Sequence, residues 1–432
     1  MEKSDLKAQM LSYAQARAPQ TPIHLQALHL LEELEIPTTK HEEWKYLNLK
    51  NLLSRTYTFA NGNQQESQFP QSIPNICDNN SANVLTFVNG VYRPELSCLV
   101  SPPSELTVCS LLEAKSNYPN LVDLYFGKYA NADQHIFAAF NTALEAQGAF
   151  VYVPNNKVVE TPVVIRCIAC PKESHLLIQV RHLIVVGRSA QLTLVEHYSS
   201  ASTPYHSFTN LVAEVIVLEN AHLQHYKIQD ESATASHIGL TQVWQLQDSY
   251  YANTTISLDG ELTRNNLHIA LDGQNCQAYM NGLYVLDNKT VTDNHTVVDH
   301  RKPNSSSNEL YKGILKGKTQ AIFNGKIFVR PNAQKTNAFQ SNKNILLSPN
   351  AQVDTKPQLE IWADDVKCSH GCTVGALDEE PLFYLRTRGI DEENARALLI
   401  FAFAQDVLER IELPSVRQYV EKSIAERLKM NL

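Results

Sequence analysis

Long apolar runs are missing from this sequence of 432 residues, and neither sign of charge dominates it. A membrane-spanning helix needs roughly 20 consecutive apolar residues, and no uninterrupted run comes near that length. The opening residues, MEKSDLKAQMLSYAQ, also lack the basic start and apolar stretch of a signal peptide. A formal net charge of −8 argues against a dedicated nucleic-acid surface. We therefore expect a soluble cytoplasmic protein with neither a nucleic-acid nor a membrane partner.

Cysteine is sparse as well, with 8 residues scattered along the chain. This usage in a chain of such length fits a reducing compartment better than a disulfide framework. Two of the cysteines form an isolated CxxC, Cys167 and Cys170. Residues three apart on a strand point to opposite faces, so we interpret this pair as buried apolar side chains rather than as a metal site.

No phosphate-binding loop is recognisable either. The segment GILKGKT, residues 313–319, is one residue shorter than the P-loop pattern. A strand-like segment, QAIFNGKIFV, follows it, whereas phosphate binding requires the N-terminus of a helix at that place. We interpret the segment as a turn.

Residues 1–149 are predicted to form a mostly helical region with a small hairpin. SDLKAQMLSYAQAR and TPIHLQALHLLEELEIP repeat apolar residues every three or four positions, and the second has Thr21 as N-cap and Pro22 in its first turn. Asn89-Gly90, between β-branched and aromatic residues, indicates the hairpin. QHIFAAFNTALEAQG predicts a further helix that ends at Gly148.

Residues 150–372 have an apolar period of two. A dozen or more short strand-like runs are closed by Gly, Asn, Asp or Pro. No helical pattern of ten residues interrupts them, which excludes a βαβ sheet and leaves a sandwich, a barrel or a solenoid. The corners GRSAQL, LENAHL and SPNAQV precede similar strands and favour a β-helix. Coils of about 24 residues would make about nine coils.

Residues 373–432 return to helical patterns. Asp378 and Asp391 are the predicted N-caps of two helices, and Gly389 is the predicted end of the first. Three helices leave little core of their own, so we expect their apolar side chains to dock onto the β-region or onto another protein. The apolar residues of the second helix are Leu398, Leu399, Phe403, Val407 and Ile411.

The segment WADDVKCSHGCTVG holds the main candidates for chemistry. If the chain is extended here, Cys368, His370 and Cys372 project from one face. Thiolate with imidazole suits zinc, copper or iron, and such a row leaves the metal shell open. A cysteine nucleophile with His370 as its base is a second interpretation. The third is that one cysteine packs inward and His370 is simply exposed.

His295 and His300 are weaker candidates. They flank TVVD next to a polar loop, RKPNSSSNE. They could line a surface site, but we expect them to be solvated loop histidines.

Several long segments resemble the SufB/SufD family, whose members are subunits of the SufBCD iron–sulfur cluster assembly complex. The resemblance runs from about residue 40 to 410 and is densest from 291 to 390. It implies a right-handed parallel β-helix between helical N-terminal and C-terminal segments, and a non-catalytic scaffold function. The segments that carry it are KHEEWKYLNL, GAFVYVPNNKVVETPVVI, HTVVDHRKPNSSSNELYKGILKGKTQAIFNGKIFV, AQKTNAFQSNKNILLSPNAQVDTKPQLEIWADDVKCSHGCTVG and LFYLRTRGI.

The resemblance also implies partners and a site. A SufB-like paralogue would pair along the β-helix, and a SufC-like ABC ATPase would dock on the C-terminal helices. In the CSHG motif, Cys368 and His370 would be ligands of a transient iron–sulfur cluster, made of iron and sulfide, at the subunit junction. Cys372 stands where the family usually has no thiol, so it is a candidate of this sequence alone. For the isolated chain we expect a homodimer, and flavin binding is left open.

Two rival functions remain at this point. β-Helices also occur in polysaccharide lyases and hydrolases, which need clustered carboxylates. The carboxylates of this sequence are dispersed, apart from the neighbours Asp364 and Asp365, which point to opposite faces of an extended chain. The other rival is a purely structural solenoid, in which changing Cys368 or His370 has no effect.

Overall fold

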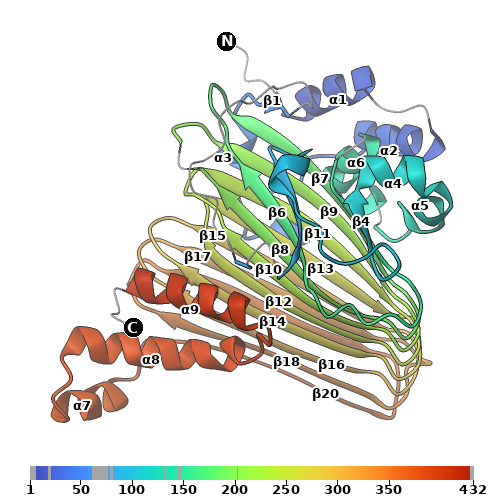
Figure 1. Cartoon of the computed structure of the whole chain (residues 1–432). Helices are drawn as coiled ribbons and strands as arrows, with labels where there is room; N and C mark the ends of the chain where they lie inside the picture. Colours follow the sequence, from blue (N-terminus) through green and yellow to red (C-terminus); the bar gives the residue numbers. More distant parts are fainter. Residues whose placement is uncertain are drawn as a thin grey trace.

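The computed structural model describes residues 6–17, 21–60, 76–77, 81–130, 132–144, 147–201 and 203–428. Within these residues the chain forms a parallel β-solenoid with helical segments at its N-terminal and C-terminal sides (Figure 1). Strands β5 to β20 alternate between two sheets, so sixteen strands make eight coils. The predicted parallel β-helix with helical flanks is confirmed; its right-handedness stays a prediction.

The two sheets face each other across the interior of the solenoid, and each contains 10 strands. The first sheet consists of β19 (Gln352–Ile361), β17 (Gln320–Val329), β15 (Val291–His300), β13 (Leu262–Leu271), β11 (Ala235–Gln245), β9 (Ser207–Val217), β7 (Leu176–Val186), β5 (Ala149–Val153) and β4 (Thr107–Ser110), with β1 (Thr58–Phe59) beside β7. The second sheet consists of β20 (Val366–Gly375), β18 (Thr336–Leu346), β16 (Ser306–Leu315), β14 (Gln277–Leu286), β12 (Tyr250–Asp259), β10 (His222–Asp230), β8 (Gln191–Ser200), β6 (Val163–Ala169), β2 (Asn83–Val88) and β3 (Val91–Tyr92).

The coils are longer than the sequence predicted. Gln191 pairs with His222, and His222 pairs with Tyr250, so these coils contain 31 and 28 residues. The expected coil of about 24 residues is wrong, because each coil contains two strands of about ten residues and two turns. The solenoid therefore has eight coils and not the predicted nine, and each coil is longer.

Small residues make the corners possible, as the sequence predicted. Ser189 and Asn220 adopt positive φ values of 54° and 55°, which turn the chain sharply. Ala190 and Ala221 follow these turns directly and are buried, since the chain folds back onto itself there. Ala351 is buried directly after the turn at residues 349–350. Inside the coils, alternate residues of both sheets fill one continuous apolar core.

The N-terminal helices cover the outer face of the first sheet. Their apolar side chains pack on outward residues of β7, β9, β11 and β13, such as Phe208 and Ile238. These elements are α1 (Leu6–Arg17), α2 (Pro22–Glu33), η1 (Glu42–Trp44), α3 (Lys50–Leu53), α4 (Leu111–Asn117), α5 (Pro119–Tyr125), η3 (Ala132–Gln134) and α6 (Ile136–Ala143). The short helix η2 (Pro94–Leu96) lies at the second sheet instead, where Leu96 packs with Val88 and Ile168. The hairpin prediction is confirmed, because β2 and β3 pair antiparallel around Asn89 and Gly90, both with positive φ.

Helix α6 is shorter than predicted. It ends at Ala143, since Leu144 has extended backbone angles, φ −103° and ψ 152°. Residues 145 and 146 lie outside the described residues. Gly148 does not stop the helix but lets two backbones approach: a Cβ there would lie 1.8 Å from the Arg181 carbonyl oxygen.

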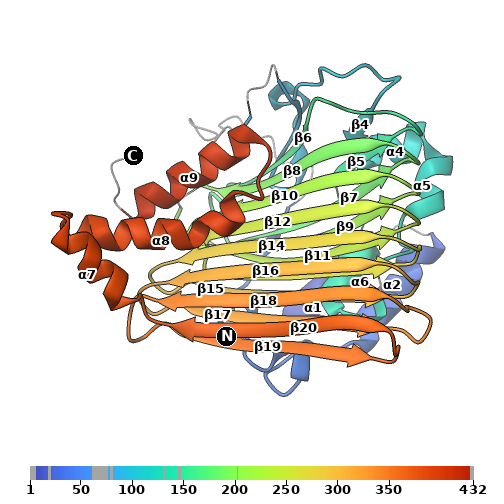
Figure 2. The same ribbon diagram turned by 90° about the horizontal axis from the view of Figure 1, so that it is seen from below.

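The C-terminal helices α7 (Glu379–Thr387), α8 (Glu392–Leu408) and α9 (Pro414–Leu428) cross the second sheet (Figure 2). The predicted N-caps are confirmed: the Asp378 carboxylate accepts from the Glu380 N–H at 3.0 Å, and that of Asp391 from the Asn394 N–H at 3.0 Å. Among the described residues, no helix combines the length and the apolar character needed to cross a bilayer.

Candidate functional site

Strand β20 carries the predicted site and is the outermost strand of the second sheet. Its neighbour is β18, and the outermost strand of the first sheet is β19. Together they form the rim at the C-terminal end of the solenoid (Figure 2), which we call the open end. An outermost strand presents backbone N–H and C=O groups along one edge, where another strand can pair with it.

The pairing register places the candidate side chains on one face. Cys368 lies opposite Ala338, His370 opposite Gln340, and Cys372 opposite Asn342. These three β18 residues are buried between the two sheets. Because side chains in register share a face of the sheet, the two thiols and the imidazole lie on the interior face of β20 at the open end.

The three candidates differ in exposure. Cys368 is half-buried and packs against the cluster that contains Ile327 and Val329, whereas His370 and Cys372 are exposed. Burial raises the pKa of the Cys368 thiol, and a hydrogen bond from the Ala338 backbone lowers it in part. The thiol is therefore protonated at neutral pH and must release a proton when it binds a metal.

This row of donors is incomplete as a metal site. Residues two apart on a strand are separated by about 6.6 Å, whereas zinc and related metals bind sulfur and nitrogen at about 2.0–2.3 Å. Among the residues that the structure describes, no group of three or more His, Cys, Asp or Glu is arranged to hold a metal ion. A complete shell needs donors that approach β20 from outside.

A buried carboxyl lies two strands behind His370. The register runs from His370 to Gln340 on β18 and to Glu309 on β16. Oε2 of Glu309 accepts a hydrogen bond from Nε2 of Gln340 at 2.6 Å, and burial raises the pKa of Glu309 to about 7. Glu309 cannot be recognised as buried from the sequence, because an alternating strand does not reveal which of its faces is the interior.

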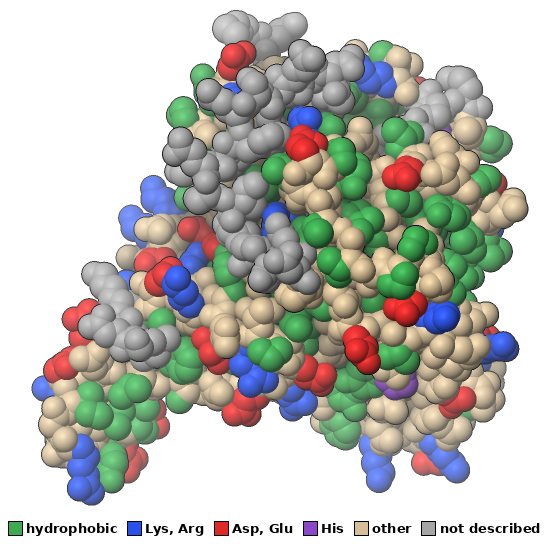
Figure 3. Space-filling view, viewed as in Figure 1, with side chains coloured by type: hydrophobic (Ala, Val, Ile, Leu, Met, Phe, Trp, Pro, Cys, Tyr) green, Lys and Arg blue, Asp and Glu red, His purple; other side chains and the backbone are tan. Residues whose placement is uncertain are grey.

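The C-terminal helices present an apolar surface to solvent. Phe383 and Tyr384 on α7 are 68% and 58% exposed, and Leu398 on α8 is 43% exposed. Hydrophobic side chains gather over α7 and α8 in the space-filling view (Figure 3). In contrast, Val407 and Ile411 are buried in the cluster that joins α8 to the second sheet. The helices thus dock on the β-region with one face, as predicted, and leave another uncovered.

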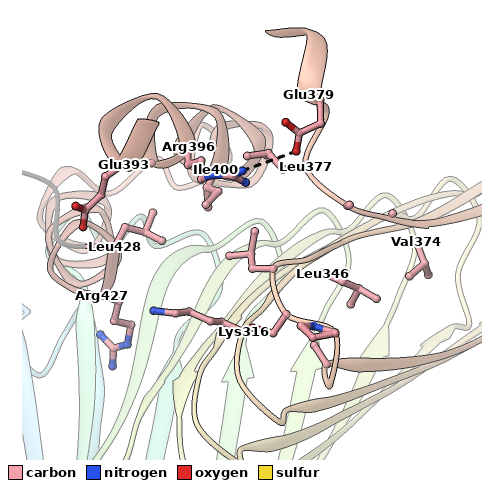
Figure 4. A pocket seen from close by; sticks show the side chains of 17 residues that line it. Lys316, Leu346, Val374, Leu377, Glu379, Glu393, Arg396, Ile400, Arg427 and Leu428 are labelled. Atoms are coloured by element: carbon pink, nitrogen blue, oxygen red, sulfur yellow. Dashed lines mark ion pairs between the residues drawn. The ribbon is translucent and has the colours of Figure 1, made fainter. Parts of the chain in front are cut away.

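A groove of about 770 Å³ separates α8 and α9 from the last coils (Figure 4). Leu346 and Val374 line it from the solenoid, and Ile400 and Leu428 line it from the helices. An ion pair of 3.8 Å joins Arg396 of α8 to the Glu379 carboxylate at the start of α7. We call α7 to α9 the C-terminal arm.

The other candidate residues of the sequence analysis lie outside β20. Cys167 and Cys170 are buried in separate apolar clusters, which confirms their interpretation. The interpretation of residues 313–319 as a turn is confirmed in part: residues 316–319 form the turn between β16 and β17, whereas residues 313–315 belong to β16. The expectation that His295 and His300 are solvated loop histidines is wrong, because both are buried in β15 and neither lies in a loop. His295 does line a pocket on the outer face of the first sheet.

Two family models match the chain. "SUF system FeS cluster assembly, SufBD core domain" matches residues 169–403, and "SufBD protein N-terminal region" matches residues 15–165. The chain belongs to the SufBD family. This SufBD protein is therefore a protein of the SUF system for iron–sulfur cluster assembly.

Three curated relatives can be aligned with this chain over nearly its whole length. The iron–sulfur cluster assembly protein SufD of Escherichia coli is 32% identical over 417 residues, which cover 95% of this chain and 93% of that protein. An iron–sulfur cluster assembly SufBD family protein of Synechocystis is 32% identical over 408 residues, covering 92% and 89%. SufD of Bacillus subtilis is 28% identical over 423 residues, covering 94% and 93%.

Proposed function

We propose that this SufBD protein is a non-catalytic scaffold subunit that contributes Cys368 and His370 to a cluster site shared with a second chain. The observation that carries the proposal is the position of these two side chains. They lie on one face of the outermost strand, with an exposed backbone edge beside them and too few donors to complete a metal shell. Such a site is completed by a partner that pairs with β20.

A SufB-like paralogue fits this requirement. A second two-sheeted solenoid can extend both sheets if its own outermost strands meet β19 and β20. Trp362 and Val374 at the open end are 48% and 46% exposed, so pairing would also bury apolar surface. Two copies of this chain can meet in the same way, which supports a homodimer when the paralogue is absent.

Iron and sulfide are the cargo of this site. Thiolate and imidazole both bind iron, and the partner would supply the remaining ligands. A shell divided between two chains opens when the chains move apart, so the finished cluster can leave for an acceptor. Cys372 is exposed on the same face and is a third donor that this sequence adds.

The C-terminal arm would dock a SufC-like ABC ATPase. Phe383 and Tyr384 form an exposed aromatic pair on α7, and aromatic side chains are frequent anchors of protein interfaces. The arm joins the last coils next to β20, so movement of the ATPase would be transmitted to the open end. ATP hydrolysis belongs to that partner, and this chain would remain non-catalytic in a cytoplasmic complex.

The ligand proposal is tested by Cys368→Ala with His370→Ala in the complete complex. We expect cluster formation, followed by the visible absorbance of the cluster, to fall roughly 100-fold, as it does when metal ligands or their supports are lost. Ser369→Ala changes the opposite face of the same strand and is the matched control. Unimpaired cluster formation by the double variant would contradict the proposal and favour a purely structural solenoid.

The docking proposal has a separate test. Phe383→Ala with Tyr384→Ala should abolish capture of the SufC-like ATPase by the purified chain, with the melting temperature unchanged. Tyr118→Ala removes an exposed aromatic side chain at the other end and should have no effect. If the α7 double variant captures the ATPase as well as the parent chain does, the interface lies elsewhere.

A further inference from the structure

A second concave region lies far from β20 in the sequence, on the outer face of the first sheet. It encloses about 700 Å³ between β11, β13, β15 and β17 and the N-terminal segments around Tyr129 and His135. Pockets for small organic molecules have about this volume, roughly 300–1,000 Å³. We propose that this pocket, which we call the lateral pocket, binds an aromatic molecule that carries a phosphate or carboxylate group.

The pairing register explains why the sheet is hollow here. Trp244, Ala270, Asp299 and Phe328 lie side by side on four successive strands, and Val297 lies beside His268. Ala270 and Val297 are the small members of these rows, so they leave a depression between the larger side chains. Tyr129 extends the aromatic wall, with its ring 5.1 Å from the ring of Trp244. The result is a flat apolar surface that suits an aromatic ring.

One carboxylate organises two guanidinium groups beside this wall. Asp299 accepts from Nε of Arg301 at 2.8 Å and from Nε of Arg330 at 2.7 Å. The Arg301 guanidinium lies 4.6 Å from the Trp244 ring, and that of Arg330 lies 5.2 Å from the Phe328 ring. Each guanidinium has five N–H donors, so both keep donors for a ligand anion after pairing with Asp299.

The charges of the lateral pocket do not balance. Its cations are Lys128, Arg264, Arg301, Lys326 and Arg330. The anions are Glu43 and Asp299 in the lining and Asp293, which pairs with Arg264 at 2.6 Å. Glu360 is a further anion, whose charge acts on Arg330. Five cations and four anions leave an excess of one positive charge. An anionic ligand would compensate this excess, whereas a cation would add to it.

Two histidines of the lining offer further polar contacts. His135 and His268 lie with their rings 6.0 Å apart, and neither ring makes a hydrogen bond to another described residue. Burial is the main cause that lowers their pKa values, to about 4 and about 3, so both are neutral at pH 7. A neutral imidazole offers one donor and one acceptor, which can bind the ring heteroatoms or hydroxyl groups of a ligand.

The test uses the purified full-length chain and four probes: adenosine monophosphate, benzoate, adenosine and inorganic phosphate. We expect at least one of the two aromatic anions to bind, measured by calorimetry and by quenching of tryptophan fluorescence. Adenosine and phosphate should bind about 10-fold more weakly than adenosine monophosphate, because each lacks one half of the recognised structure. Binding should also weaken as salt increases.

Three variants locate the binding. Arg301→Gln with Arg330→Gln should weaken binding of the aromatic anions about 10-fold or more. Ala270→Leu should fill the floor and weaken binding without a change of charge. Arg386→Gln with Arg388→Gln removes two exposed cations at the C-terminal end of α7 and is the matched control. Melting curves of each variant confirm that it folds.

Two outcomes would overturn the proposal: no detectable binding of either aromatic anion, or binding that both pocket variants leave unchanged. The residues concerned lie on the outer face of β11 to β17, whereas Cys368 and His370 lie on β20 of the other sheet. Cys368→Ala with His370→Ala should therefore leave ligand binding intact. A failure of the cluster-site proposal and a failure of this one are distinguishable.

Discussion

The two ends of the solenoid are finished in different ways. At the N-terminal end, β4 pairs antiparallel with β5, and the β2–β3 hairpin pairs with β6. Helices α4 and α5 pack beside them, and β6 is buried along its whole length. At the C-terminal end, β19 is mostly half-buried, and β20 is exposed over most of its residues. The chain covers one end of the solenoid itself and leaves the strands of the other end more exposed.

The two strands of the open end also differ from each other. β19 contains Pro357, which lacks an N–H and is tolerated at the edge of a sheet. Lys356 of β19 pairs at 2.5 Å with Glu42 of the N-terminal segment. β20 has no proline, and it carries the thiols and the imidazole. If a partner pairs with the open end as we propose, this contrast makes β20 the strand on which that pairing depends most.

The largest expected effect compares one substitution at the two ends. Val163 of β6 is fully buried and Val374 of β20 is 46% exposed, and both lie in the second sheet. Val163→Asp should destabilise the fold by more than about 4 kcal/mol, because it buries an unpaired carboxylate. Val374→Asp should lower stability by less than about 1 kcal/mol. Yields of folded protein and melting curves measure the stability of both variants. Equal losses of stability would contradict the difference between the two ends.

The second prediction compares two buried carboxyls, one towards each end. Burial raises the pKa of Glu309 to about 7 from an ordinary value of 4.5. Between these pH values the folded chain keeps a proton that the unfolded chain has lost, so stability falls as pH rises. Glu309→Gln removes this loss and should raise stability relative to the parent chain by about 3 kcal/mol at pH 8, with little effect at pH 4.5.

Glu196, towards the N-terminal end, should behave in the opposite sense. Burial alone would raise its pKa, but the hydrogen bond and charge of His225, at 3.1 Å, lower it below the ordinary value. Its contribution to stability is present at pH 8 and is lost as pH falls through its folded pKa. Glu196→Gln should therefore destabilise the chain at pH 8. Melting curves from pH 4.5 to 8 measure both variants, and shifts of the same sign would contradict the contrast.

The smallest effect concerns the attachment of the C-terminal arm near the open end. Lys312 of β16 has a buried side chain, and its ammonium donates to the Asp406 carboxylate at 2.5 Å and to the Phe403 carbonyl at 2.7 Å. Asp406→Ala should lower the free energy of unfolding by about 1–2 kcal/mol. This is less than the loss expected when a fully buried ion pair is broken, because Asp406 is largely exposed. Adding Lys312→Met to the Asp406→Ala variant should restore most of the lost stability, because it removes the buried ammonium that has no carboxylate partner.

Limited proteolysis checks where this loss occurs. Asp406→Ala should speed cleavage in the arm, at α7 and α8, while the solenoid stays resistant. Faster cleavage within the coils would mean that the arm stabilises the solenoid itself.

The sequence predicted the solenoid because its signals are local. Period-two strands and the small corner residues, such as Ala190 and Ala221, are visible in short windows. The coil length was wrong because the corners are irregularly spaced and only the register of pairing defines a coil. The predicted end of the helix at Gly148 was wrong for a related reason. Close packing of Gly148 on the Arg181 backbone, a contact between distant segments, sets the path of the chain there.

The candidate site was only partly predictable for the same physical reason. Alternation along one strand suffices to place Cys368 and His370 on one face. His295 was expected in a solvated loop, but it is buried with its ring nitrogens 2.9 Å from Asp293 and 3.5 Å from Glu43. Glu43 belongs to the N-terminal segment, and no local pattern shows that it covers β15. Glu309 was not predicted, because the burial of a carboxyl depends on the neighbouring strands and not on its own sequence segment.

The most direct measurement is hydrogen exchange of the β20 amides, in the isolated chain at low concentration and in complex with the SufB-like paralogue. If the partner completes the open end, exchange of β20 should slow by about 10-fold or more, while β5 and β6 remain slow in both states. Unchanged exchange in β20, with protection confined to the C-terminal arm, would contradict the account.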